Sequence, residues 1–424
     1  MPLERPLSFL IACLFLLALI FSDYLVGRLT AEDAITSGLA LLIPLVAVRV
    51  FWTLTSTWRS QLARKIISYS VFFSVAILAS IGVLGVMNGL VATSKVPYFF
   101  GFSFYTASLA FQLREGPIWS GRSLVTANPL LLYTGPIVTM VHEVFHWGLR
   151  RRIKNFVPYL IAGIFMSMVI ALGLSPLLSI GQNPGLVPFL VFGLVFELYI
   201  YFNFAGLSLM VYGVAGILGL RLPLNFQQPF SSSNLIDFWR GWHLSMSTVL
   251  KSIFFTPVRK AANSTLAIFV VFLSSALWHG VSVNFVLWGL LHASAFVLTS
   301  RLLRKGWHVL AGALLPICLV VARGIFGTRD FSTLRANLFG LEDVSDQIHL
   351  IMSVFKESEL TSQIALLFAL AIVLLEVVCR NNPKFIGRNY KFLRIRPVQV
   401  WIMALSVLLI SGSIGEVVAA YGQR

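Results

Sequence analysis

Charged residues are scarce in this sequence, and their scarcity excludes most soluble classes of protein. Asp, Glu, Lys and Arg make up 11% of the 424 residues, whereas soluble proteins carry about 25%. Hydrophobic residues make up 58%, which is more apolar surface than a soluble chain of this length can bury. The composition excludes a soluble globular enzyme, a disordered protein and a coiled coil, and it predicts a protein that crosses a membrane several times.

Cysteines and acidic residues are also few. Cys13, Cys318 and Cys379 lie far apart, and no CxxC pair exists, so neither a disulfide framework nor a cysteine-based zinc site is indicated. The chain has 16 acidic against 32 basic residues, a net charge of +16, and we expect this excess mostly in cytoplasmic loops. Because no basic patch interleaved with aromatic residues lies outside the loops, the charge does not indicate nucleic-acid binding.

Long apolar runs are what the sequence has instead. They predict an all-α polytopic fold with about eleven membrane-embedded helices, some of them re-entrant, in a single domain over 1–424. The runs 186–220 and 263–300 are each long enough for two helices. Segment 221–255 has no clean apolar span, so we expect it to dip into the protein interior without crossing. The remaining runs cover about 1–27, 33–54, 66–92, 97–112, 128–147, 156–180, 308–326, 360–379 and 397–420.

Basic clusters at the ends of these runs predict the orientation. Arg150–Lys154, Lys251–Lys260 and Arg301–Lys305 are expected on the cytoplasmic side by the positive-inside rule. The pair of helices expected in 263–300 leaves one basic cluster and returns to another. The turn between these two helices is therefore expected on the side of the membrane opposite the cytoplasm.

One short motif suggests a metal site. His142–His146 reads HEVFH, which matches the zinc-binding helix of a metalloprotease. Such a site needs a third ligand, and no later acidic motif obviously completes it. A membrane zinc protease is therefore a minor alternative, and a helix at the membrane interface is the preferred interpretation.

Two segments that combine Trp and His carry the stronger signal. Asp237–Ser247 reads DFWRGWHLSMS, and Leu277–His292 reads LWHGVSVNFVLWGLLH. His279 lies in a stretch without charge, where an ionisable side chain needs a partner or a wet cavity. A neutral imidazole is also a natural general base near pH 7. From the residues alone, a functional role for His279 and a satisfied core histidine are equally open, and His292 is expected to pack at the interface.

These motifs resemble the membrane-bound O-acyltransferases, in particular their bacterial branch of alginate O-acetyltransferases and D-alanyl-teichoic-acid transferases. Weaker matches at Gly101–Thr106, Gly135–Ile137 and Tyr201–Gly206 extend the resemblance over about 95–295. The match at Gly135–Ile137 also places His142 in a family segment without a metal role.

The resemblance implies direct transfer of an acyl group from a thioester to a hydroxyl. It makes His279 the general base, while His243 orients the acceptor, donates to the oxyanion or relays the proton. No metal and no permanently bound cofactor are expected. Five further residues are expected to bind substrate or donor or to support the site: Asp237, Trp239, Arg240, Trp278 and Asn284.

Several positions depart from the family pattern. Lys251 and Ser252 stand where the family usually has Arg and Asp, and Asn203 replaces an acidic residue. These changes concern recognition of the acceptor or of a carrier protein, and they leave His279 untouched. Glu197 lies within an apolar run, so it needs a partner or a wet cavity; a place in the acyl path and a structural pair are equally open.

The leading hypothesis is an O-acyltransferase in the cytoplasmic membrane of a bacterium, surrounded by membrane lipid. The donor is expected to be acyl-CoA or an acyl-carrier-protein thioester, and the acyl group, with acetyl favoured, is expected to pass through a central tunnel. The acceptor is an envelope or exported glycan, or an extracytoplasmic partner acyltransferase that completes the transfer. Transfer of D-alanyl or another short acyl group is the alternative within the class. A transporter or flippase is the rival from another class, although it gives no reason for two Trp-His segments.

Overall fold

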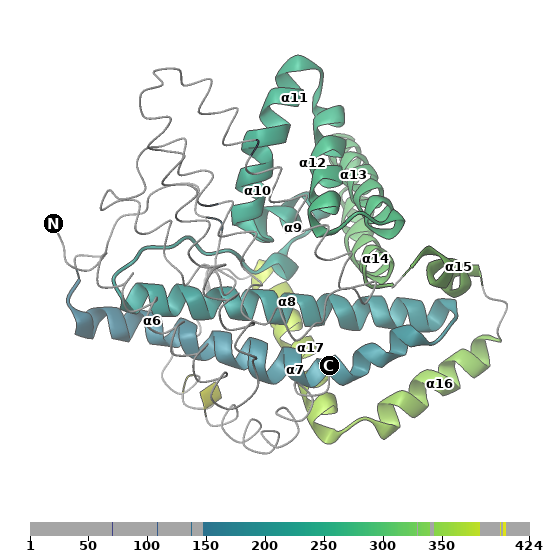
Figure 1. The fold of residues 1–424 in the computed structure, drawn as a ribbon, viewed down its shortest axis with the longest axis horizontal. Coiled ribbons are helices and arrows are strands. Elements are labelled where there is room, and N and C mark those ends of the chain that lie inside the picture. Colours follow the sequence, from purple (N-terminus) through teal and green to yellow (C-terminus); the bar gives the residue numbers. More distant parts are fainter. Residues whose placement is uncertain are drawn as a thin grey trace, which may run out of the picture. The chain divides into compact units, whose positions relative to one another are not determined.

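The computed structural model describes residues 147–328, 330–339 and 343–381, together with residues 70, 108, 137, 399, 402 and 403. All the longer elements in these ranges are helices (Figure 1), which confirms the all-α fold class. The HEVFH motif, the N-terminal runs and the run 397–420 lie outside the described ranges, apart from those isolated residues.

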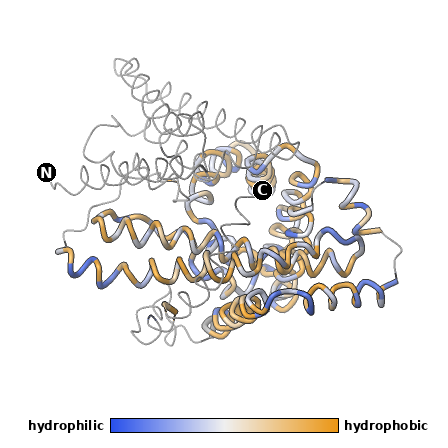
Figure 2. Tube along the Cα trace, turned by 60° about the horizontal axis from the view of Figure 1, so that its bottom comes forward, coloured by the Kyte–Doolittle hydropathy of each residue, from blue (hydrophilic) through white to orange (hydrophobic). Residues whose placement is uncertain are grey.

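Five helical stretches in the described part are long and apolar enough to cross a membrane. Figure 2 shows hydrophobic residues in orange along these long helices and hydrophilic residues in blue, chiefly near helix ends and connections. The total of about eleven helices stays a prediction, because it includes runs outside the described residues. The five stretches are Leu149–Gln182, Leu186–Ile217, Val283–Arg304, His308–Gly327 and Leu360–Val378.

The chain divides into two compact units. Unit 1 comprises Met1–Leu160, Leu207–Leu224 and Gly412–Arg424, and unit 2 comprises Ile161–Gly206 and Asn225–Ser411. In unit 1, the ring of Tyr212 packs edge-on against Phe156 and Tyr159, with centroids 5.5 and 5.0 Å away.

In unit 2, three consecutive helices form two hairpins. They are α12 (Ser264–His279), α13 (Val283–Arg304) and α14 (His308–Gly327). The side chain of Asn263 caps α12 by accepting from the Leu266 N–H at 2.8 Å. The turn between α13 and α14 uses Gly306 at φ +77°. The expectation that 263–300 forms two helices is thus confirmed.

The other long run folds differently. Residues 186–220 were long enough for two helices, but the structure shows one, α8 (Leu186–Ile217), of 32 residues. The expectation of two helices is wrong because nothing interrupts the backbone. Pro188 lies in the first turn, where its missing N–H costs little, and no turn-forming cluster follows it.

The stretch before α8 is continuous from α6 (Leu149–Ile164) through η2 (Phe165–Ala171) and α7 (Leu172–Leu174) to η3 (Ser175–Gln182). Within unit 2 it packs against α8, because a Cβ at Gly206 would lie only 2.7 Å from the Ser167 nitrogen. The Ser167 hydroxyl donates to Asn203 Oδ1 at 3.2 Å.

Segment 221–255 contains only short helices, and none of the five candidate spans falls in it. This confirms the expectation of no clean span there. The elements are η4 (Pro229–Ser231), α9 (Leu235–Gly241), α10 (Leu244–Leu250) and η5 (Lys251–Phe255), followed by α11 (Thr256–Ala261). After α14, the chain forms α15 (Phe331–Phe339), α16 (Val344–Glu357) and α17 (Leu360–Asn381).

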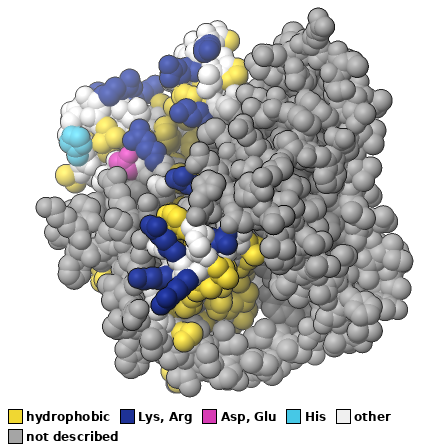
Figure 3. Space-filling model, turned by 90° about the vertical axis from the view of Figure 1, so that its left-hand side faces the viewer, with side chains coloured by type: hydrophobic (Ala, Val, Ile, Leu, Met, Phe, Trp, Pro, Cys, Tyr) yellow, Lys and Arg dark blue, Asp and Glu magenta, His cyan; other side chains and the backbone are white. Residues whose placement is uncertain are grey.

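Two of the predicted basic clusters lie at one end of the α12–α13 hairpin. Arg259 and Lys260 precede α12, and Arg301 and Arg304 end α13. Figure 3 shows how Lys and Arg side chains gather in groups beside hydrophobic ones on one face of the molecule. The opposite end of this hairpin is the turn after His279.

Close contact between α8 and α14 fixes the register of these two helices. A Cβ at Gly193 would collide with the carbonyl oxygen of Val320, and one at Gly324 would lie 2.6 Å from the Phe189 ring. Both positions therefore need glycine for the helices to approach.

We predict that Gly193→Val destabilises the protein by about 1–3 kcal/mol, because the added side chain forces α8 away from α14. The measurement is the temperature at which the detergent-solubilised protein loses its monodisperse peak. Gly148→Val is the control, since a Cβ there meets nothing within 4 Å. Equal melting of both variants would contradict the close packing.

Candidate active site

His243 lies in the turn between α9 and α10, in a left-handed backbone conformation with φ +43°. L residues adopt it rarely, and such strained positions cluster at functional sites. Asn225, which is 3% exposed, holds the turn. Its carbonyl oxygen accepts from the Leu244 N–H at 2.9 Å, and its Oδ1 accepts from the N–H and the hydroxyl of Ser245 at 3.2 and 2.9 Å. The loop before α9 thus presents the histidine of the first motif.

Aromatic rings surround His243. The ring centroids of Phe204 and Phe226 lie 5.4 and 6.2 Å from that of the imidazole. Burial lowers the pKa of His243 to about 3, and the charge of His279 is the second cause of the lowering. The His243 imidazole is therefore neutral near pH 7. The histidines of the two motifs lie close enough for their charges to interact.

His279 is the last residue of α12, and Gly280 at φ +152° turns the chain into α13. Three rings surround its imidazole. The centroids of Phe326, Trp288 and Phe285 lie 5.0, 5.9 and 6.3 Å away. Trp278, the preceding residue, is buried.

Asn284 fastens the end of α14 beside the start of α13. It is 2% exposed, and its Nδ2 donates to the carbonyl oxygen of Thr328 at 2.8 Å. Its Oδ1 has no hydrogen-bond partner in the described part of the chain. The hydrogen bond brings Phe326 of α14 to the level of His279.

Asp237 and Arg240 make local contacts at α9. Asn234 caps this helix and donates from Nδ2 to Asp237 Oδ2 at 2.8 Å. Arg240 Nη1 donates to Asp237 Oδ1 at 2.9 Å, and the Arg240 side chain is 75% exposed. Within the described residues, the structure thus gives this pair a place at the surface of α9.

Trp239 and His292 belong to a second aromatic cluster. The Trp239 ring lies 5.1 Å from His292 and 5.3 Å from Phe272. His292 is 2% exposed, and its Nδ1 lies 3.2 Å from the Trp288 carbonyl oxygen, to which it donates. His292 is therefore buried within the protein and satisfied by its own helix, and its position relative to the membrane interface stays a prediction.

Arg323 is a buried charged residue that the sequence analysis missed. It lies on α14 and donates from Nε to Oε2 of Glu197 on α8 at 2.6 Å. Both residues are buried. A lone arginine in the apolar run 308–326 was the available signal. The ion pair supplies the partner that Glu197 required.

A second buried carboxyl group was also missed. Glu376 of α17 is 3% exposed. It accepts from the Tyr201 hydroxyl and, at 3.2 Å, from the Phe230 N–H. Glu376 thus joins α17 to α8 and to the segment that leads into the first motif.

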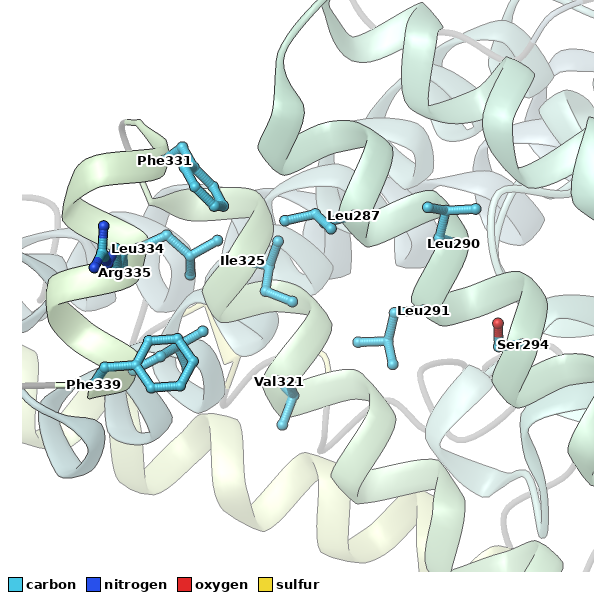
Figure 4. A pocket seen from close by; sticks show the side chains of 11 residues that line it. Leu287, Leu290, Leu291, Ser294, Val321, Ile325, Phe331, Leu334, Arg335 and Phe339 are labelled. Atoms are coloured by element: carbon cyan, nitrogen blue, oxygen red, sulfur yellow. The ribbon is translucent and has the colours of Figure 1, made fainter.

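An apolar groove of about 740 Å³ lies between α13, α14 and α15. Figure 4 shows Leu287 and Leu291 of α13 and Ile325 of α14 facing it, with Phe331 on α15. Neither His243 nor His279 lines it, so the groove is separate from the histidine pair. The described residues contain no group of three or more His, Cys, Asp or Glu side chains placed to hold a metal ion.

The fold and these contacts define a polytopic helical membrane protein with two histidines among aromatic side chains. Residues 182–323 match the model of the membrane-bound O-acyltransferase family. This segment contains His243 and His279 and is similar to that family, so the resemblance predicted from the sequence is confirmed for this part of the chain.

Relatives of known name include proteins described as O-acetyltransferases, O-acetylases and D-alanyltransferases. A peptidoglycan O-acetyltransferase of Helicobacter pylori is 35% identical over 24% of this chain and 20% of its own length. The Pseudomonas aeruginosa protein named "Probable alginate O-acetylase AlgI" is 30% identical over 38% of this chain and 36% of its own. A teichoic acid D-alanyltransferase of Streptococcus thermophilus is 25% identical over 62% of this chain and 63% of its own. Each match covers less than two thirds of the relative.

We predict that Asn225→Ala destabilises the protein by about 1–3 kcal/mol, because the N–H and hydroxyl of buried Ser245 lose their acceptor. The check is the melting temperature in detergent. Asn183→Ala is the matched control, since that side chain donates only to carbonyl oxygens of its own helix end, at 3.3 and 3.5 Å. Equal melting temperatures for the two variants would show that Asn225 does not hold the turn.

Proposed function

We propose that the chain transfers an acyl group, with acetyl favoured, from a thioester donor to a hydroxyl of an envelope or exported glycan. The observation that supports this proposal is that the two Trp-His motifs meet around one side chain: Arg323 contacts Trp242, which precedes His243, and Phe326, whose ring packs against His279. Both motifs belong to the segment that matches the acyltransferase family. The named relatives act on peptidoglycan, alginate and teichoic acid, which supports a glycan or envelope-polymer acceptor.

His279 acts as the general base in this proposal. The acceptor hydroxyl attacks the thioester carbonyl carbon while His279 takes its proton. An oxyanion forms, and its collapse breaks the C–S bond. The thiolate leaves and receives the proton from His279. The products are an ester and a thiol, and no protein nucleophile is needed.

His243 assists in the same site. The low pKa of His243 keeps its imidazole neutral near pH 7. A neutral imidazole can both donate and accept a hydrogen bond, so it is suited to orient the acceptor hydroxyl or to relay a proton. In this proposal, the aromatic side chains around both histidines limit the access of water, which protects the thioester from hydrolysis.

The dimensions of α12 support access from two sides. Its 16 residues span about 24 Å, less than the ~30 Å thickness of the hydrocarbon core. In this proposal Arg259 and Lys260 lie at the cytoplasmic surface, which puts His279 at membrane depth toward the opposite side. We propose that a central tunnel lets acyl-CoA or an acyl-carrier-protein thioester deliver the acyl group from the cytoplasm of a bacterium. The acceptor, or an extracytoplasmic partner that completes the transfer, then approaches from outside.

Two alternatives differ from the proposal in what they transfer. The match to a teichoic acid D-alanyltransferase, which extends over 62% of this chain, favours D-alanyl as the second acyl group. A transporter or flippase would move the glycan rather than modify it, and it would leave the paired histidines without a role.

We predict that deletion of the chain and His279→Ala both abolish one base-labile ester of the host's envelope glycans, because the proposed mechanism assigns removal of the hydroxyl proton to His279. Mass spectrometry of the released acyl groups measures this loss and identifies the group. His308→Ala, at an exposed position at the start of α14, should keep the ester.

The other outcomes separate the hypotheses. An unchanged ester profile in the deletion strain overturns acylation of envelope glycans. Loss in the deletion strain alone keeps the chain in the pathway but rejects His279 as the base. Loss of exported glycan itself, measured in the same strains, favours a transporter.

A further inference from the structure

Arg323 and Glu197 form an ion pair inside unit 2. Arg323 is 8% and Glu197 3% exposed, and Nε donates to Oε2 at 2.6 Å. Bringing two charges out of water costs several kcal/mol for each ion in general, and an apolar pair of similar volume is often as stable. Packing alone therefore gives little reason for charges at this position.

The pair lies between the two histidine motifs. The guanidinium carbon lies 5.3 Å from the Phe326 ring centroid, and that ring contacts His279. On another side, the guanidinium lies 5.8 Å from the ring of Trp242, the residue before His243. Arg323 thus contacts the first motif through Trp242, and one aromatic ring, that of Phe326, connects it to His279.

The hydrogen bonds of the pair are incomplete. In the part of the chain that the structure describes, Nε makes the guanidinium's one hydrogen bond to another side chain, which leaves the Nη1 and Nη2 donors for another acceptor. Glu197 Oε1 is buried and has no partner among the described residues. An arginine holds five N–H donors in a rigid plane, so fixing Nε also fixes the direction of the others.

We infer that Arg323 supplies the N–H donors that stabilise the oxyanion of the acyl transfer, and that Glu197 is a positioning residue that fixes the guanidinium. The inference rests on the proposed function. As the C–O bond forms, the carbonyl electron pair moves onto oxygen and meets the free guanidinium N–H groups. Collapse of this intermediate returns the pair to the C=O bond and expels the thiolate. Fixed donors in a water-excluded site are worth far more than donors in water.

Removing both charges together distinguishes this role from a structural one. A structural pair tolerates loss of both partners better than loss of one, because no lone charge stays buried. The double variant Glu197→Gln with Arg323→Gln should then regain both folding and activity. An oxyanion donor cannot be regained in this way, so the double variant should fold but stay inactive.

The experiment measures the rate of ester formation on envelope glycans after induced expression in the deletion strain, with protein amounts equalised by immunoblot. We expect Arg323→Gln and the double variant to be about 100-fold slower than the wild type, which is typical of losing one oxyanion donor. Arg323→Lys should recover part of the rate, and Glu197→Gln should lie between. Arg304→Gln, exposed at the end of α13, is the matched control and should keep the full rate. Melting temperature in detergent reports folding separately.

The outcomes separate the two proposals. A folded double variant with a near-wild-type rate overturns the inference and makes the pair structural, as does a folded Arg323→Gln variant with a normal rate. If deletion leaves every ester unchanged, the proposed function fails and the role of Arg323 fails with it. If deletion abolishes the ester and His279→Ala does too, only the Arg323 variants decide this inference.

Discussion

A charged or polar side chain inside a membrane-embedded helix bundle is stable only where another part of the protein satisfies it. In unit 2, this constraint ties together elements that are distant in sequence. Glu197 joins α8 to α14 through Arg323, and Glu376 joins α17 to α8 and to the Phe230 backbone. Asn225 holds the His243 turn. The polar contacts that relieve the cost of burial are therefore the same contacts that position the first histidine motif.

The succession of helical hairpins determines which helix ends lie beside one another in unit 2. Because α12, α13 and α14 form successive hairpins, the end of α12, the start of α13 and the end of α14 meet at one level, and the Asn284–Thr328 hydrogen bond marks it. Residues 279, 284 and 326 then share one region although they come from three helices. The glycines at 193 and 324 let α8 approach the same end of α14, which brings Glu197 within reach of Arg323.

Sequence patterns predicted those parts of the fold that depend on neighbouring residues. The uncharged stretch around Gly280 predicted the α12–α13 hairpin, and the polar composition of 221–255 predicted the absence of a span. The extent of α8 was not predictable, because an uninterrupted apolar run of this length fits one long helix or two shorter ones.

The role of Arg323 in packing was missed because it depends on a residue that is distant in sequence. A lone arginine in an apolar run signals a buried charge, but its partner lies 126 residues away, and only the packing of α8 on α14 reveals it. The burial of His292 was also not predictable, because distance from a basic cluster does not show whether a helix face meets lipid or protein.

Aromatic side chains carry two roles at this site, and the roles depend on each other. Phe326 and Trp242 lie on different sides of the Arg323 guanidinium, while Phe326 also covers His279 and Phe226 covers His243. Trp242 and Phe226 are themselves buried, as is Arg323, and in a low-dielectric environment each electrostatic interaction becomes stronger. Burial also raises the cost of every unsatisfied donor, so the Nη donors of Arg323, which have no partner among the described residues, are most stable when an anionic oxygen reaches them. In the proposed reaction, a guanidinium fixed between the two histidine motifs favours the charge distribution of an oxyanion over that of a neutral carbonyl, and differential stabilisation of this kind is what lowers a reaction barrier.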